Sequence, residues 1–90
     1  MKSYVIKETA CEEAFARHSE FKETVRDTKC LFDQMRQAMQ EHDPDFNKVR
    51  LLAPVIKGLA KQHASDYKKL VNWLEEQRPA EGEDSTAFYI

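Results

Sequence analysis

Residues 11–39 read CEEAFARHSEFKETVRDTKCLFDQMRQAM, and this stretch decides the fold. Apolar and small residues recur in it at alternating steps of three and four without a break. These seam positions are Cys11, Ala14, His18, Phe21, Val25, Thr28, Phe32, Met35 and Met39. Such spacing is typical of a long helix that packs along another helix as in a coiled coil. We therefore predict an all-α protein whose first helix covers about residues 9–41 and buries this seam, with Phe32 as a large core residue.

A second helix is predicted over about residues 44–77, antiparallel to the first. The link between them, His42-Asp43-Pro44, is short, and Asp43 is suited to cap a helix that begins at Pro44. Helices joined by so short a link pack as antiparallel neighbours. The predicted inward positions of the second helix are Val49, Leu52, Ile56, Leu59, His63, Tyr67, Leu70 and Leu74.

Pro54 lies inside this second helix. A proline removes a backbone hydrogen bond and its ring crowds the preceding turn, so we expect the helix to be kinked near Pro54. The alternative is a separate short helix over residues 44–52, with Pro54 opening the next one.

The apolar side of the second helix is wider than one neighbouring helix can cover. At about 100° per residue, Leu51, Val55 and Trp73 fall to one side of the predicted seam. A second copy of the chain would cover them, so we expect a homodimer that forms a four-helix bundle.

Both ends of the chain are strand-like. Residues 3–6 (SYVI) and 87–90 (AFYI) are apolar and β-prone, and the predicted helix pair brings them to the same end of the molecule. We expect them to pair as a small ribbon or to dock on the bundle. Residues 1–78 are predicted to form the helical domain, and residues 79–90 a flexible acidic tail with an apolar end.

Cysteine usage and hydropathy favour a cytoplasmic protein. On one continuous helix, Cys11 and Cys30 would lie about 30 Å apart, far beyond the reach of a disulfide. We therefore expect Cys11 to pack as a small apolar residue and Cys30 to be an exposed, reduced thiol. No apolar run resembles a signal peptide or a membrane span, so we predict no membrane association.

The sequence carries no pattern that predicts catalysis, a cofactor or a metal. His18 and His63 fall on inward positions, where we expect hydrogen-bonded core histidines, with His18 near Tyr67 and His63 near Glu23. A metal site on helices would need further ligands one turn away. Cys30 has no histidine within a turn that could act as its base. We predict that the protein is not an enzyme and has no catalytic, cofactor-binding or metal-ligating residues.

Basic residues form a stripe on the predicted second helix. Its members, spaced seven, four and seven apart, are Arg50, Lys57, Lys61 and Lys68, and they extend over about 27 Å. Such a stripe fits the phosphates of a nucleic acid or an acidic protein surface. A second basic row, Lys22, Lys29 and Arg36, lies beside the first seam. The alternative is a solvated face balanced by a neighbouring row of acids, Glu13, Glu20 and Asp27.

These features together favour a non-catalytic interaction protein that binds and modulates a larger macromolecular partner, as an inhibitor or adaptor does. Aromatic side chains are enriched among the residues that contribute most to binding at protein interfaces. We therefore predict that the partner-binding residues are Trp73, Phe88, Tyr89 and Ile90. The first alternative is a nucleic-acid-binding bundle that uses the basic stripe. The second is a structural subunit of a larger assembly.

Overall fold

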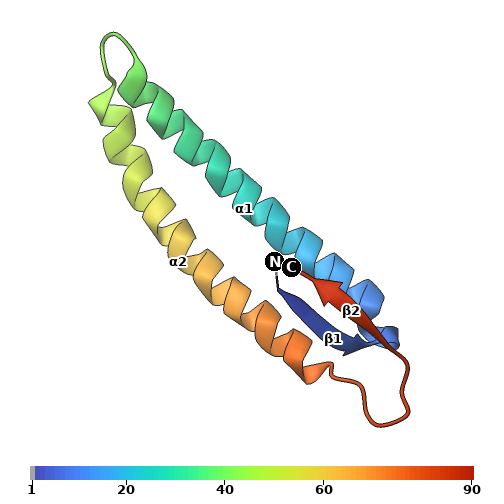
Figure 1. Cartoon of the computed structure of the whole chain (residues 1–90). Helices are drawn as coiled ribbons and strands as arrows, with labels where there is room; N and C mark the ends of the chain where they lie inside the picture. The colour runs from blue at the N-terminus through green and yellow to red at the C-terminus, as the bar shows by residue number, and fades with distance from the viewer. Residues whose placement is uncertain (1) are drawn as a thin grey trace. The chain divides into compact units, whose positions relative to one another are not determined.

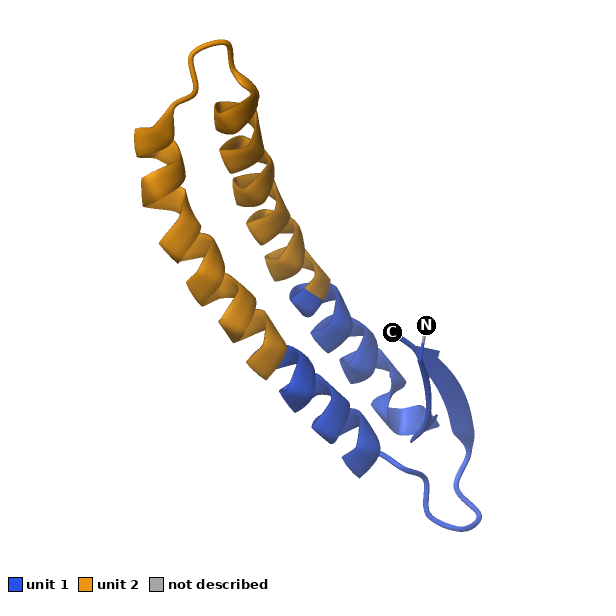
Figure 2. Ribbon diagram, turned by 60° about the vertical axis from the view of Figure 1, so that its left-hand side comes forward, with its two compact units in different colours: residues 1–21, 66–90 blue, residues 22–65 orange. Residues whose placement is uncertain are grey.

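A computed structural model describes residues 2–90 (Figure 1). Strand β1 (Ser3–Lys7) leads through a short 3₁₀ helix, η1 (Glu8–Ala10), into helix α1 (Cys11–Gln40). Helix α2 (Phe46–Glu76) and strand β2 (Ser85–Tyr89) follow. Figure 2 shows the two compact units of the chain. We call residues 1–21 with 66–90 the sheet unit, and residues 22–65 the turn unit.

Helices α1 and α2 pack against each other within each unit, which confirms the predicted helix pair. In the sheet unit, the rings of Phe21 and Tyr67 lie 5.9 Å apart between their centroids. In the turn unit, the side chains of Thr28 and His63 are hydrogen-bonded across the two helices. Both pairs join residues of the seams that the sequence predicted.

Helix α2 begins two residues later than predicted, and its cap is Asp45. The Asp45 carboxylate accepts a hydrogen bond from the backbone N–H of Lys48, at 3.1 Å, which is the contact of an N-cap. The prediction of a cap at Asp43 and a helix start at Pro44 is therefore wrong. The reason is that the Asp45 N–H donates to the carbonyl of Ala38, at 3.1 Å. This bond closes the turn on the end of α1 before α2 can begin.

Helix α2 continues through Pro54 without interruption. The alternative of a separate short helix over residues 44–52 is therefore wrong. Packing of the flanking apolar positions Leu52 and Ile56, both half-buried, outweighs the one backbone hydrogen bond that Pro54 cannot make.

Strands β1 and β2 form an antiparallel two-stranded sheet, as the ribbon prediction required. Tyr4 lies opposite Phe88 and Ile6 opposite Thr86, so that these pairs share one face of the sheet. Two further backbone bonds, at 3.1 and 3.0 Å, join Lys2 and Ile90 and extend the pairing to the chain end. The proposed division into residues 1–78 and 79–90 stays a prediction.

The core of the sheet unit lies between the sheet and both helices. Ile6 and Leu74 are fully buried, and they pack together with Ala14, Leu70 and Phe88. Side chains alternate across a strand, so Tyr4 and Ile6 turn toward the helices while Val5 remains 57% exposed. The sheet thus supplies the cover that two helices alone could not provide for each other.

The turn unit is much less well covered. Among its residues Ala38 is the one that the structure buries, whereas Phe32 is 47%, Met39 48% and Val25 39% exposed. The expectation that the whole α1 seam, Phe32 included, is buried is therefore wrong here. On this part of α1 the covered rows are Thr28 with Met35 and, on the other side of them, Leu31 with Ala38. One neighbouring helix covers two adjacent rows, so the row of Val25, Phe32 and Met39 is left open.

Candidate functional site

The exposed apolar residues of the turn unit lie on two sides of the seam that Thr28 and His63 mark. On α1, Val25 and Phe32 are three and four residues from Thr28; on α2, Ala60 is three residues before His63. These spacings place each residue to one side of Thr28 or His63 around its own helix. Because the two helices run in opposite directions, Val25, Phe32 and Ala60 lie on the same side of the seam. At heptad spacing, this side carries Val25, Phe32 and Met39 from α1 and Phe46, Ala53 and Ala60 from α2. We call this set of six residues the apolar strip.

Leu51 and Val55 lie on the opposite side of the same seam. Leu51 is 72% exposed and Val55 49% exposed. Leu51 lies twelve residues and Val55 eight residues before His63 on α2. These spacings place both side chains on the side of the helix away from Ala60. The turn unit therefore has two separate apolar surfaces, the apolar strip and this second surface, which we call the Leu51 side.

Basic residues border the apolar strip along both edges. The row next to Val25 and Phe32 on α1, and the row next to Ala53 and Ala60 on α2, are basic and exposed: Lys22, Lys29, Arg36, Arg50, Lys57 and Lys61. Between residues 46 and 65 the sequence has no Asp or Glu at all. On the α1 edge, Arg36 forms an ion pair with Asp33 at 3.4 Å, and both side chains are exposed. The strip is thus apolar in the middle and positive at its edges.

All four residues of the predicted basic stripe are exposed. Arg50, Lys57 and Lys61 belong to the turn unit and Lys68 to the sheet unit. Among residues 2–90, none of the four forms an ion pair or a side-chain hydrogen bond. The alternative of a solvated face and the alternative of phosphate binding both stay predictions.

The predicted anchors near the C-terminus differ in exposure. Phe88 is in the core and its ring makes an edge-to-face contact with His18, with centroids 5.7 Å apart. Trp73 is half-buried, with the guanidinium of Arg17 4.5 Å from its ring centroid. Ile90 packs against the core, whereas Tyr89 is 59% exposed. Tyr89 is therefore the most accessible of the four, and their role in partner binding stays a prediction.

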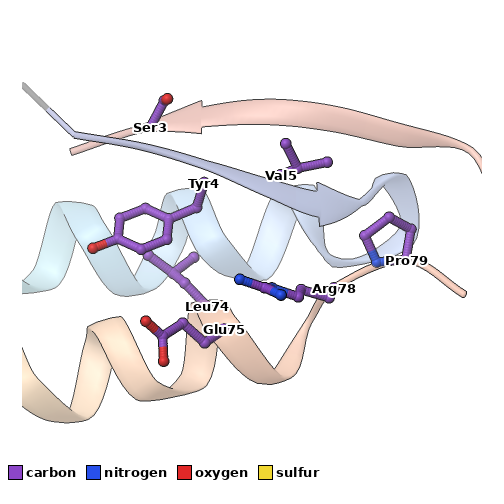
Figure 3. A pocket seen from close by; sticks show the side chains of 7 residues that line it. All are labelled: Ser3, Tyr4, Val5, Leu74, Glu75, Arg78 and Pro79. Carbon is purple, nitrogen blue, oxygen red and sulfur yellow. The ribbon is translucent and has the colours of Figure 1, made fainter.

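A shallow groove of about 520 Å³ lies between β1 and the end of α2 in the sheet unit (Figure 3). The Tyr4 ring points toward the helices beside Leu74, while the side chains of Ser3 and Val5 point away. Glu75, Arg78 and Pro79 complete its lining. The groove offers one guanidinium, one carboxylate and one phenol, but no histidine or cysteine lines it. These groups can bind a ligand through charge and hydrogen bonding.

The histidines take part in packing and hydrogen bonding. His63 is hydrogen-bonded to Thr28, five residues beyond the predicted neighbour Glu23, and His18 packs on Phe88. Tyr67, the expected neighbour of His18, has its ring against Phe21. Tyr67 thus faces Phe21 instead of His18, and His63 faces Thr28 instead of Glu23, because the offset between the two helices is not fixed by sequence spacing alone.

The side chains that could bind a metal ion are dispersed over the described residues 2–90. Within residues 2–90, no group of three or more His, Cys, Asp or Glu side chains could hold a metal ion. Cys11 is half-buried and Cys30 exposed, as predicted, and both are free thiols.

Across residues 2–90, neither helix combines the length and the apolar character that crossing a membrane requires. No protein-family model, no curated protein and no solved structure matches this chain.

Proposed function

We propose that this chain is a non-catalytic interaction protein that binds and modulates a larger protein partner in the cytoplasm, as an inhibitor or adaptor does. The observation that carries the proposal is the apolar strip of the turn unit, where Phe32, Met39 and Phe46 are 47%, 48% and 61% exposed. Contiguous exposed apolar surface on a small domain marks interaction sites. Aromatic residues among it are the side chains that dominate binding energy at protein interfaces.

The test is capture of the partner by the whole chain as bait in an extract of its source, followed by mass spectrometry. The capture is repeated with Phe32→Ser and with Tyr89→Ser, because these residues belong to the turn unit and the sheet unit respectively. We expect one protein to be enriched by the parent chain and to be lost with at least one variant. Circular dichroism melts show whether each variant is folded. Equal enrichment by an unrelated helical bait would contradict the proposal.

The same chain is proposed to form a homodimer through the Leu51 side, giving a four-helix bundle. Leu51 and Val55 supply exposed apolar area there, and their side of the seam carries an acid, Asp27, as well as a base, Lys48. A surface with both signs of charge can pair with a copy of itself in an isologous contact. Trp73, the third residue expected at this contact, is instead half-covered by Arg17 of its own chain. A kink of α2 at Pro54 would bend the helix beside Val55, and we include it in the proposal.

Sedimentation equilibrium at micromolar concentration tests the dimer. The parent chain is expected at twice its mass of 10.5 kDa. Leu51→Glu should return a monomer, because it places a charge in the proposed contact. Tyr89→Glu, a matched change at an exposed residue of the sheet unit, should remain dimeric. A monomeric parent chain at all concentrations would exclude this assembly.

Nucleic-acid binding is the second candidate function, favoured by the absence of ion pairs at Arg50, Lys57, Lys61 and Lys68 among residues 2–90. Cationic side chains that are not neutralised within the protein can release counterions from phosphates, so affinity would fall steeply with salt. Titration of labelled RNA and DNA at several salt concentrations tests this candidate. Weak binding without a salt slope would leave the protein-partner proposal as the better one.

A further inference from the structure

We propose that the apolar strip binds an acidic amphipathic α-helix of a partner protein, which lies along the turn unit as a third helix. The inference rests on the proposed function and names its site and the chemistry of its partner. It follows from the composition of the strip, from its length and from the charges at its edges.

The strip has the dimensions of a helix-binding surface. Val25 and Met39 are two heptads apart on α1, which corresponds to about 21 Å. A partner helix of about four turns would cover this length. Its knobs would pack between a row of large residues, Val25, Phe32 and Met39, and a row that is small at Ala53 and Ala60. Small residues on one side let a third helix approach α2 closely, as packing of ridges into grooves requires.

The charges at the edges select an acidic partner. Each edge of the strip is basic, with Lys22 and Lys29 on α1 and Lys57 and Lys61 on α2. In helix bundles, the residues that flank an apolar seam set the choice of partner by pairing opposite charges. A helix with acids on both flanks of its apolar stripe would meet bases on both sides. Both side chains of the ion pair between Arg36 and Asp33 are exposed, and exposed ion pairs are weak. Arg36 can therefore leave Asp33 and pair with an acid of the partner helix.

A second copy of the chain and a membrane fit this surface less well. If two copies of the chain packed through their apolar strips, their basic edges would lie next to each other. Like charges across an interface are unfavourable. Membrane-surface helices present large apolar residues such as Trp, Phe and Leu toward the acyl chains. Two of the three strip positions on α2 are alanines, Ala53 and Ala60, which contribute little area to a bilayer but leave room for a helix.

The experiment titrates the whole chain into a fluorescein-labelled synthetic peptide and follows anisotropy. The peptide has about three heptads, with Leu and Ile at the seam positions and Glu at the flanking positions. A matched peptide has Lys in place of every flanking Glu. The chain is tested as the parent, as Lys57→Glu/Lys61→Glu, and as the control Lys2→Glu/Lys69→Glu, two residues of the sheet unit. The control carries the same charge change at exposed residues outside the edges of the strip. Circular dichroism confirms that each variant is folded.

We expect the Glu-flanked peptide to bind and the Lys-flanked peptide to bind at least about tenfold more weakly. Lys57→Glu/Lys61→Glu should weaken binding of the Glu-flanked peptide by a similar factor, and the control should change it little. Backbone amide shifts on binding should be concentrated at the strip, around Phe32 and Ala60. High salt should weaken the complex.

Several results would overturn the inference. Equal binding of both peptides would remove the charge selection, and equal loss in both double variants would place the contact elsewhere. Binding to anionic phosphatidylserine vesicles but not to the peptide would favour a membrane. Loss of self-association in Phe32→Ser would assign the strip to a second copy. If the peptide fails while the partner captured from extract still binds Lys57→Glu/Lys61→Glu, the proposed function stands and the assignment of the strip fails.

Discussion

The hydroxyl of Thr28 on α1 is hydrogen-bonded to Nε2 of His63 on α2, and it lies 3.2 Å from the carbonyl oxygen of Thr24. A hydroxyl has one proton. Both contacts are satisfied together when Oγ1 donates to the Thr24 carbonyl and accepts a hydrogen bond from Nε2–H of His63. This pair joins the two helices of the turn unit and fixes which rows of side chains face each other there.

Thr28→Val tests the contribution of that bond. Valine keeps the shape of threonine and its helix propensity, but it leaves Nε2–H of His63 without this acceptor. Because the contact is partly buried, we expect the free energy of unfolding to fall by about 1 kcal/mol. Urea denaturation measures the change, with Ser65→Ala, an exposed helical position, as the control. If Thr28→Val unfolds at the same urea concentration as the parent, the bond contributes nothing to stability.

Asp45→Ala and Asp43→Ala distinguish the observed cap from the one that the sequence suggested. Asp45 accepts from the N–H of Lys48 at 3.1 Å, so its loss should destabilise the protein by about 1 kcal/mol. Asp43 is exposed, and we expect its substitution to change stability by no more than about 0.5 kcal/mol. Thermal melts of the two variants are compared directly. A larger loss for Asp43→Ala would mean that α2 begins earlier than the structure shows.

Leu74→Ala should be the most damaging of the core substitutions that we consider. Leu74 is fully buried in the core of the sheet unit, and truncation there should cost about 2–5 kcal/mol. Phe32→Ala should cost less, because Phe32 is 47% exposed and its removal creates a smaller cavity. The comparison uses urea denaturation at low protein concentration, where association contributes least. The reverse order would mean that the apolar strip is covered within the chain.

The guanidinium of Arg17 above Trp73 should be visible in fluorescence, because Trp73 is the single tryptophan of the chain. Arg17→Leu should shift the emission of Trp73 and lower the free energy of unfolding by about 0.5–1 kcal/mol. Arg17 also pairs with Glu13 at 2.8 Å, so Glu13→Gln is the matched control. Glu13→Gln removes the exposed ion pair and keeps the cation on the ring. Unchanged emission in Arg17→Leu would show that the contact is not formed in solution.

The sequence by itself determined the two helices and the strand-like character of both chain ends. The unbroken heptad spacing around Phe21 and Thr28 requires a helical partner, and antiparallel helices bring the β-prone ends of the chain to the same end of the molecule. Of the two arrangements left open for these ends, the structure shows the paired one. These are local periodicities, and a period can be read from residues without knowing what lies beside them. The exposure of Cys30 followed from the same period.

The tertiary structure alone decided which row of the seam is covered and where α2 begins. Val25 and Phe32 have the same spacing as Thr28 and Met35, and the sequence gives no reason to treat the rows differently. Burial depends on how α1 is rotated against α2, and that rotation covers Thr28 and Met35 together with Leu31 and Ala38 and leaves Val25 and Phe32 open. The cap moved from Asp43 to Asp45 because a backbone bond from Asp45 to Ala38 closes the turn first. Phe88 entered the core because antiparallel pairing with β1 places it opposite Tyr4, in the same core cluster as Ile6 and Leu74. No local pattern encodes this contact between the two ends of the chain.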